Sequence, residues 1–345
     1  MADTQAFIPE VINAHFDEAA YLYSEFQAEV NAPKPDVVYL KGVVSRIDAN
    51  LDGLAINAVA SWPYCEAAIE GDDAGEFFVA TYLAFHSADL EKIKPVVDAG
   101  QTAPQLLQAV ACGLTWHPWS SSSFWATKFI GAKQTAMAAI GLFCFNSYKK
   151  PPPIHYSILL TRSLASKKAV ELPLLLSIGR KNSDTSILPI LQQNTSDQID
   201  DTQFQILKTR LKLGDFSALA QIKPFVLNDN SHREQALNLA FSQLAQIEAK
   251  QWMGELKNTP DSERYLLLAV GAMSEKQLLP WVVKQMEVPA LARIAGKVFG
   301  ELSGQDLRKN AWIVEDDAMD EQWLALDGDE ELDWPDVEKI KQAML

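Results

Sequence analysis

The sequence predicts an all-α protein built as a right-handed solenoid, in which pairs of helices stack one on another along the chain. The main support is a recurring spacing: a residue that closes one helical pattern is followed nine or ten residues later by a Pro within a Leu-, Ile- or Val-rich run. Self-similarity at roughly 20 to 50 residues is typical of stacked helical pairs. Apolar and polar residues hardly ever alternate with a period of two, so no sheet is expected. The spacing recurs at Phe85/Pro95, Gly141/Pro151, Gly179/Pro189, Gly214/Pro224 and Gly271/Pro280.

Residues 1–75 are expected to form a helical cap at the front of this stack. Apolar residues recur at helical spacing through 11–26 and again through 40–54. A break with two Pro residues at 31–36 separates the two stripes, and Asp36 can cap the second helix.

Residues 76–304 are expected to hold the repeats. In each pair a Gly would supply the left-handed residue that ends the first helix, because Gly has no Cβ to clash. The Pro would lie near the start of the second helix, where its missing N–H removes no intrahelical hydrogen bond. Apolar stripes on a single face are clear at 235–247 and 291–302, and Ser274 with Gln277 has the form of a capping box.

One stretch within the repeats, 115–125, departs from this pattern. Trp116, Trp119 and Trp125 surround the run Ser120–Ser123, whose composition predicts a loop. One interpretation is a divergent repeat in which the three Trp side chains fill a wide gap. The other is an exposed aromatic patch that contacts a partner, since Trp is enriched among the residues that dominate binding energy at interfaces.

The last segment, 305–345, combines acidic residues with Trp. Twelve Asp and Glu and no Lys or Arg lie between Glu315 and Glu338; without them the net charge of −15 would be only −3. The segment could be a solvated skirt or could dock on a basic groove. We favour a cap that inserts Trp323 and Trp334, because the terminal pair of a solenoid otherwise leaves an apolar face in water. The same two Trp residues are candidates for contacts with a partner protein.

Composition excludes several classes of protein. The chain has 345 residues, of which 48% are hydrophobic, yet its longest apolar runs span about eight residues, against the ~20 of a membrane helix. No membrane is therefore expected as a partner. The sequence also has no basic stripe that could follow a phosphate backbone, so no nucleic acid is expected as a partner. The first residues carry no secretory signal, and three Cys without C-x-x-C spacing fit reduced thiols. A cytoplasmic location is therefore expected.

No catalytic, cofactor-binding or metal-binding residues are expected. The five His residues neither pair at metal-binding spacing nor stand at such spacing from Cys, and no P-loop, dinucleotide fingerprint or G-x-S-x-G elbow occurs. The run Asp327-x-Asp329-x-Glu331 has the superficial form of a calcium loop, but Leu332 stands where such a loop needs Gly.

Several stretches near the two ends carry a resemblance: RIDANLDGL at 46–54, WPYCEAA at 62–68, GEFFVA at 75–80, the segment 279–296 and LDGDEELDWP at 326–335. They resemble a proteobacterial family of HEAT-repeat proteins without assigned activity, and the match is thin between about 115 and 235. The resemblance implies that the helical pairs are HEAT-like. It also implies a link to type VI secretion, because members are often encoded beside genes of that system. It carries over no catalytic residue.

The expected function is therefore protein–protein binding, by a non-enzymatic scaffold or adaptor in the bacterial cytoplasm that is an accessory to type VI secretion. One alternative is an immunity protein that binds and blocks a toxic effector, since acidic charge would speed association with a basic toxin. Another is a HEAT-like enzyme.

Overall fold

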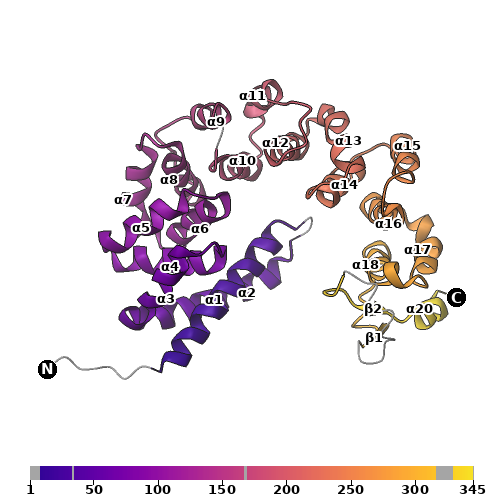
Figure 1. The fold of residues 1–345 in the computed structure, drawn as a ribbon, viewed down its shortest axis with the longest axis horizontal. Helices are drawn as coiled ribbons and strands as arrows, with labels where there is room; N and C mark the ends of the chain where they lie inside the picture. Colours follow the sequence, from indigo (N-terminus) through magenta and orange to yellow (C-terminus); the bar gives the residue numbers. More distant parts are fainter. Residues whose placement is uncertain (1–7, 33–34, 167–168, 316–328, 345) are drawn as a thin grey trace. The chain divides into compact units, whose positions relative to one another are not determined.

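The structure is a computed structural model that describes residues 8–32, 35–166, 169–315 and 329–344. In these residues the regular structure is helical, apart from one pair of two-residue strands (Figure 1). The all-α class predicted from the sequence is confirmed. The chain forms two compact units, residues 1–190 and 191–345, while the boundaries predicted at residues 75 and 304 stay a prediction. None of the described helices has the length and apolar character needed to cross a membrane.

Unit 1 consists of the following helices: α1 (Pro9–Val30), α2 (Val37–Ile56), α3 (Ala58–Glu70), α4 (Ala74–Ser87), α5 (Leu90–Gly100), α6 (Pro104–Thr115), α7 (Trp119–Ile130), α8 (Thr135–Ser147), α9 (Tyr156–Leu164), α10 (Leu172–Lys181) and the 3-10 helix η1 (Thr185–Ile187). In this unit α4, α6, α8 and α10 pack one on the next, and α5, α7 and α9 pack beside them. The helices α4 and α8 are buried over most of their length because they lie inside this row. The first three helices cover its beginning, since α1 and α3 both pack on α4.

Unit 2 repeats this arrangement after α11 (Leu188–Gln193), which joins the units in sequence. Its elements are α12 (Asp201–Lys212), η2 (Phe216–Ala218), α13 (Leu219–Leu227), α14 (Arg233–Phe241), α15 (Gln246–Leu256), α16 (Ser262–Met273), η3 (Lys276–Leu278), α17 (Leu279–Gln285), η4 (Pro289–Leu291), α18 (Ala292–Ser303), β1 (Ile313–Val314), β2 (Trp334–Pro335) and α20 (Val337–Ala343). Here α12, α14, α16 and α18 pack successively, and α13, α15 and α17 flank them.

The turns within helical pairs do use left-handed residues, but most of these are not glycines. Positive φ angles occur at Ala88, Ser183, Gly214 and Ser274, just beyond the C-terminal ends of α4, α10, α12 and α16. Gly214, at φ +86°, is the only one of the predicted glycines that ends a helix in this way. An acidic residue follows each of these four positions and stands as the N-cap residue of the next helix.

The prediction that Gly141, Gly179 and Gly271 close helices is wrong, because these residues lie inside α8, α10 and α16. Gly141 is required for a different reason. A Cβ at this position would lie 2.4 Å from the backbone nitrogen of Ile130, so the absence of a side chain lets α7 and α8 approach closely.

The run Ser120–Ser123, predicted to be a loop, is part of α7 and is a second correction. Ser has a modest intrinsic helix propensity, which tertiary packing readily outweighs. Here α7 buries Ala126 and Phe129, and the hydroxyl of Ser122 donates a hydrogen bond of 2.9 Å to the carbonyl oxygen of Leu114.

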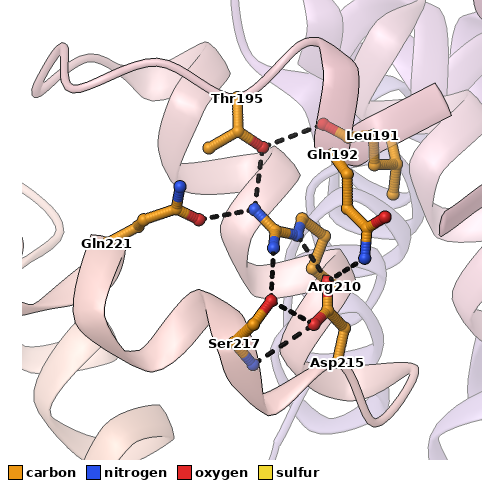
Figure 2. A network of polar contacts seen from close by, with 7 residues as sticks. All are labelled: Leu191, Gln192, Thr195, Arg210, Asp215, Ser217 and Gln221. Carbon is orange, nitrogen blue, oxygen red and sulfur yellow. Dashed lines mark hydrogen bonds and ion pairs between the residues drawn. The ribbon is translucent and has the colours of Figure 1, made fainter. Parts of the chain in front are cut away.

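A buried ion pair holds the first turn of unit 2 (Figure 2). The guanidinium of Arg210, at the end of α12, donates from Nε to Asp215 Oδ2 at 2.8 Å, and the two side chains are only 4% and 9% exposed. Asp215 is the N-cap residue of η2 and also accepts a hydrogen bond from the backbone N–H of Ser217. The remaining acceptors around the guanidinium are Thr195 Oγ1, Gln221 Oε1 and Ser217 Oγ, at 2.9, 2.6 and 2.9 Å.

Candidate functional site

Trp116 is the C-cap residue of α6 and contacts three other helices of unit 1. Its half-buried ring packs edge-on against Phe26 of α1 and Phe78 of α4, with centroid distances of 5.5 and 5.1 Å. Its indole Nε1 donates a hydrogen bond of 2.7 Å to Oδ1 of Asp48 on α2. The fold thus brings Trp116 onto an acidic side chain that lies 68 residues earlier in the chain.

Trp119 and Trp125 both lie on α7, and both are half-buried. Trp119 packs against Phe145 of α8 at a centroid distance of 5.3 Å. Trp125 packs against Phe85 of α4 at 5.5 Å, and the ammonium of Lys128 lies 5.0 Å from its ring. The three Trp residues therefore fill separate junctions between helices. Their role in binding a partner stays a prediction.

A stack of rings supports the turn that carries Trp116. The imidazole of His117 lies parallel to the ring of Tyr82, at 4.3 Å and 7°, and its Nε2 lies 3.0 Å from the carbonyl oxygen of Tyr82. Burial lowers the pKa of His117; the bond to that carbonyl opposes the shift, and the nearby His86 adds to it. The hydroxyl of Tyr148 donates to the carbonyl oxygens of Thr115 and His117. These contacts fix the backbone on both sides of Trp116.

Two acids on α2 lie near Trp116 and Tyr82. Asp48 and Asp52 are one turn apart on α2, so both carboxylates project from the same face of the helix, and both are exposed. Burial raises the pKa of Tyr82, and the negative charges of Asp52 and Asp48 raise it further.

Unit 2 carries a pocket of about 380 Å³ beside η2, α13 and α15. Phe216 lines it and is 58% exposed. Leu244 and Trp252 add apolar surface, while Lys223 and Glu248 bring one charge of each sign. The pocket is open to solvent, and its lining mixes apolar with polar side chains.

The two Trp residues predicted in the last segment have different outcomes. Trp323 lies outside the described residues. Trp334 is 2% exposed, and the guanidinium of Arg293 on α18 lies 4.5 Å from its ring. The ring packs on α18, the last helix of the row. Its contact with a partner stays a prediction.

Two kinds of reactive group can be checked in the described residues, metal clusters and thiols. Within them, no three His, Cys, Asp or Glu side chains are placed to hold a metal ion. Burial raises the pKa of the three Cys thiols, that of Cys65 to about 12. A nucleophilic thiol needs a lowered pKa, so none of these thiols is activated.

Sequence reasoning found Trp116 but missed the other members of its site. The spacing of Asp48 and Asp52 was a visible signal, because residues four apart on a helix share a face. Nothing in the sequence indicated that they lie near Tyr82, since this depends on how α2 and α4 pack.

Comparison with known proteins returns no match: no protein-family model, curated protein or solved structure is found to be similar to this chain.

Proposed function

We propose that this chain is a non-enzymatic protein-binding scaffold or adaptor, built as a right-handed solenoid of HEAT-like helical pairs. Two features support the solenoid: every second helix packs on the next within each unit, and a left-handed residue followed by an acidic N-cap recurs at four of the turns. The resemblance of the chain's end motifs supports a place in the bacterial cytoplasm as an accessory to type VI secretion.

The observation that carries the binding role is Phe216 in the pocket of unit 2. Its side chain is 58% exposed, although a buried Phe contributes roughly 1.5 to 3 kcal/mol of transfer free energy. The half-buried Leu244 and the largely buried Trp252 line the same pocket. A few aromatic anchors dominate the energy of most protein interfaces, and Phe216 is an exposed aromatic side chain of this kind.

The test is affinity capture with the full chain, followed by mass spectrometry and a measured affinity for the captured protein. Phe216→Ala should weaken binding about thirtyfold, as expected for an anchor that contributes ~2 kcal/mol. Ile199→Ala is the matched control, because Ile199 is 42% exposed, lies in the same unit and does not line the pocket. Equal affinity of the two variants would remove the pocket from the proposal. Failure to capture any stoichiometric partner would contradict the scaffold itself.

An immunity protein that blocks a basic toxin is the second candidate, and the net charge of −15 favours it. Long-range attraction between opposite charges speeds association and is screened by salt. The association rate of an immunity complex should therefore fall steeply as the ionic strength rises. The association rate of an apolar adaptor complex should hardly change with ionic strength.

A further inference from the structure

One face of α2 is exposed over most of its length. Val38 and Ile56 are 81% and 72% exposed, and they point in the same direction because they are separated by about five full helical turns. Ser45 and Ala49 lie between them on this face and are also exposed. We call these four residues the α2 face. The opposite side of the helix packs into unit 1 through Val43, Ile47, Leu51 and Leu54.

The apolar surface gathers at the two ends of the α2 face. Val37 is exposed beside Val38, and Val59, at the start of α3, is exposed just beyond Ile56. Singly scattered apolar residues are normal on a protein surface, but these lie at the two ends of one line with small side chains between them. A second helix laid along this line would cover both ends at once.

The α2 face is complementary to itself. When two copies of α2 lie antiparallel about a twofold axis level with residue 47, Val38 of one copy lies opposite Ile56 of the other. Ser45 then lies opposite Ala49, and each of these contacts occurs twice. A twofold interface requires such a match of one surface to a second copy of itself.

The charges on one flank of the face match in the same arrangement. Lys41 and Asp52 are exposed and lie on the same side of the face, within about 60° of its centre. Neither forms a hydrogen bond or ion pair with a described residue. The twofold axis brings this flank of both copies together, so Lys41 of one copy is level, within one residue, with Asp52 of the other. In a parallel pair each charge would instead face its own copy and be repelled.

The other charges of α2 lie at the edges of the face. Arg46 and Asp48 are each about 80° from its centre, on opposite sides. Arg46 is engaged with Glu18 of α1, and Asp48 accepts the hydrogen bond from Trp116. Both therefore keep partners within their own chain.

We propose that the protein forms a twofold-symmetric dimer in which the α2 faces of two copies pack antiparallel. The contact from Val38 to Ile56 runs about 27 Å along the helix. The small side chains of Ser45 and Ala49 let the two helix axes approach to about 8 Å, the short end of the usual range. This inference goes beyond the proposed binding function and does not depend on it.

The experiment is sedimentation equilibrium of the full chain over a range of concentrations. The mass of the wild type should rise from 38.2 kDa toward twice that value as the concentration increases. Ala49→Glu should weaken the dimer about a hundredfold, because an unpaired charge enters the contact twice. Ala67→Glu is the matched control, since Ala67 is exposed in the middle of α3 in the same unit; this variant should dimerise like the wild type.

An exchange of charge tests the antiparallel geometry. Lys41→Asp and Asp52→Lys should each weaken self-association about tenfold, because two attractions become two repulsions. An equimolar mixture of these two variants should dimerise like the wild type. The first variant carries acids at positions 41 and 52 and the second carries lysines at both, so every facing pair in the mixed dimer is again opposite in charge.

The inference is overturned if the wild type keeps the monomer mass at every concentration, which is also the result expected if the face binds a different protein. It is equally overturned if Ala49→Glu dimerises as well as Ala67→Glu, or if the mixture associates no better than either charge variant alone. A monomer that still captures a partner would leave the proposed function standing, and a dimer that captures none would leave this inference standing.

Discussion

The substitution Asp215→Asn measures how much the cluster around Arg210 contributes to the stability of unit 2. Asn has nearly the volume of Asp, so the change removes a charge and leaves the packing. The partner guanidinium is 4% exposed and would stay buried without its counter-ion. Removing one partner of a buried ion pair typically costs about 3 to 5 kcal/mol. We expect the free energy of unfolding of unit 2 to fall by about 3 kcal/mol at pH 7.

The pH dependence gives a second measure of the same interaction. Burial raises the pKa of Asp215, but hydrogen bonds from Ser217, Gln192 and Arg210, with the positive charge of Arg210, outweigh it and lower the pKa from 3.8 to about 2. This lowering corresponds to about 2.5 kcal/mol of stability. Because the pKa of Asp215 is lower in the folded chain, its contribution to stability is fully present above the pKa of the unfolded chain. It is lost as the pH falls from about 4 to about 2. The wild type should therefore approach the variant over that range.

The assay combines urea unfolding with amide hydrogen exchange over residues 201–227, which reports on unit 2 directly. Asp229→Asn is the control, since Asp229 is exposed and forms no hydrogen bond or ion pair with the described residues. The double variant Arg210→Met/Asp215→Asn should regain part of the loss, because it removes the uncompensated charge. The reasoning is refuted if Asp215→Asn costs no more than Asp229→Asn at pH 7, or if its cost does not shrink in acid.

Three other perturbations have defined outcomes. Burial lowers the pKa of His117 from 6.5 in the folded chain, so His117 binds a proton more readily in the unfolded chain. The stability of unit 1, measured by urea unfolding, should therefore decrease as the pH falls from 6.5 to the pKa of the folded chain. The decrease should be smaller in His117→Gln. Gly141→Ala should destabilise unit 1 by about 1 to 3 kcal/mol through overpacking. Gly254→Ala should stabilise unit 2 by up to ~1 kcal/mol, because no atom lies within 4 Å of the added Cβ. Thermal unfolding measures both changes. Trp334→Ala should cost about 3 to 5 kcal/mol and should speed amide exchange in α18.

The sequence predicted the helical class well because helical periodicity and Pro placement are local signals. Pro280 lies in the first turn of α17, as expected, and Asp36 caps α2 by accepting from Val38 and Tyr39. Pro95 and Pro224 lie deeper, inside α5 and α13.

The glycines were misread because one residue type serves two purposes. A Gly can end a helix, as Gly214 does, or let two backbones approach, as Gly141 does. Ala88 and Ser274 adopt the left-handed conformation in place of Gly, at a cost of roughly 1 to 2 kcal/mol that the surrounding structure outweighs. A single sequence does not show which helix packs where, so it separates neither these cases nor the pairing of Trp116 with Asp48.

In the acidic last segment, too, the sequence alone does not show which side chains are buried. A solvated skirt would leave its carboxylates in water, but Asp329 is 4% exposed. The guanidinium of Arg264 donates to both of its carboxylate oxygens, and Arg293 donates to its main-chain oxygen at 3.0 Å. This clamp, in which Asp329 is buried and Arg264 is half-buried, lies next to Trp334, which Arg293 also covers. The geometry favours a cap that is attached through specific arginines over a segment that merely adds charge.

Asp329→Asn distinguishes these two roles. If the clamp attaches the cap, losing its charge should cost about 2 kcal/mol, the range of hydrogen bonds to a charged group, and amide exchange over 337–343 should accelerate about thirtyfold. Asp333→Asn removes an identical charge from the same segment, but its partner Arg308 is 66% exposed, so that change should cost less than 1 kcal/mol. Exchange that rises equally in both variants would mean that total charge, rather than the Arg264 contact, determines how the segment is held.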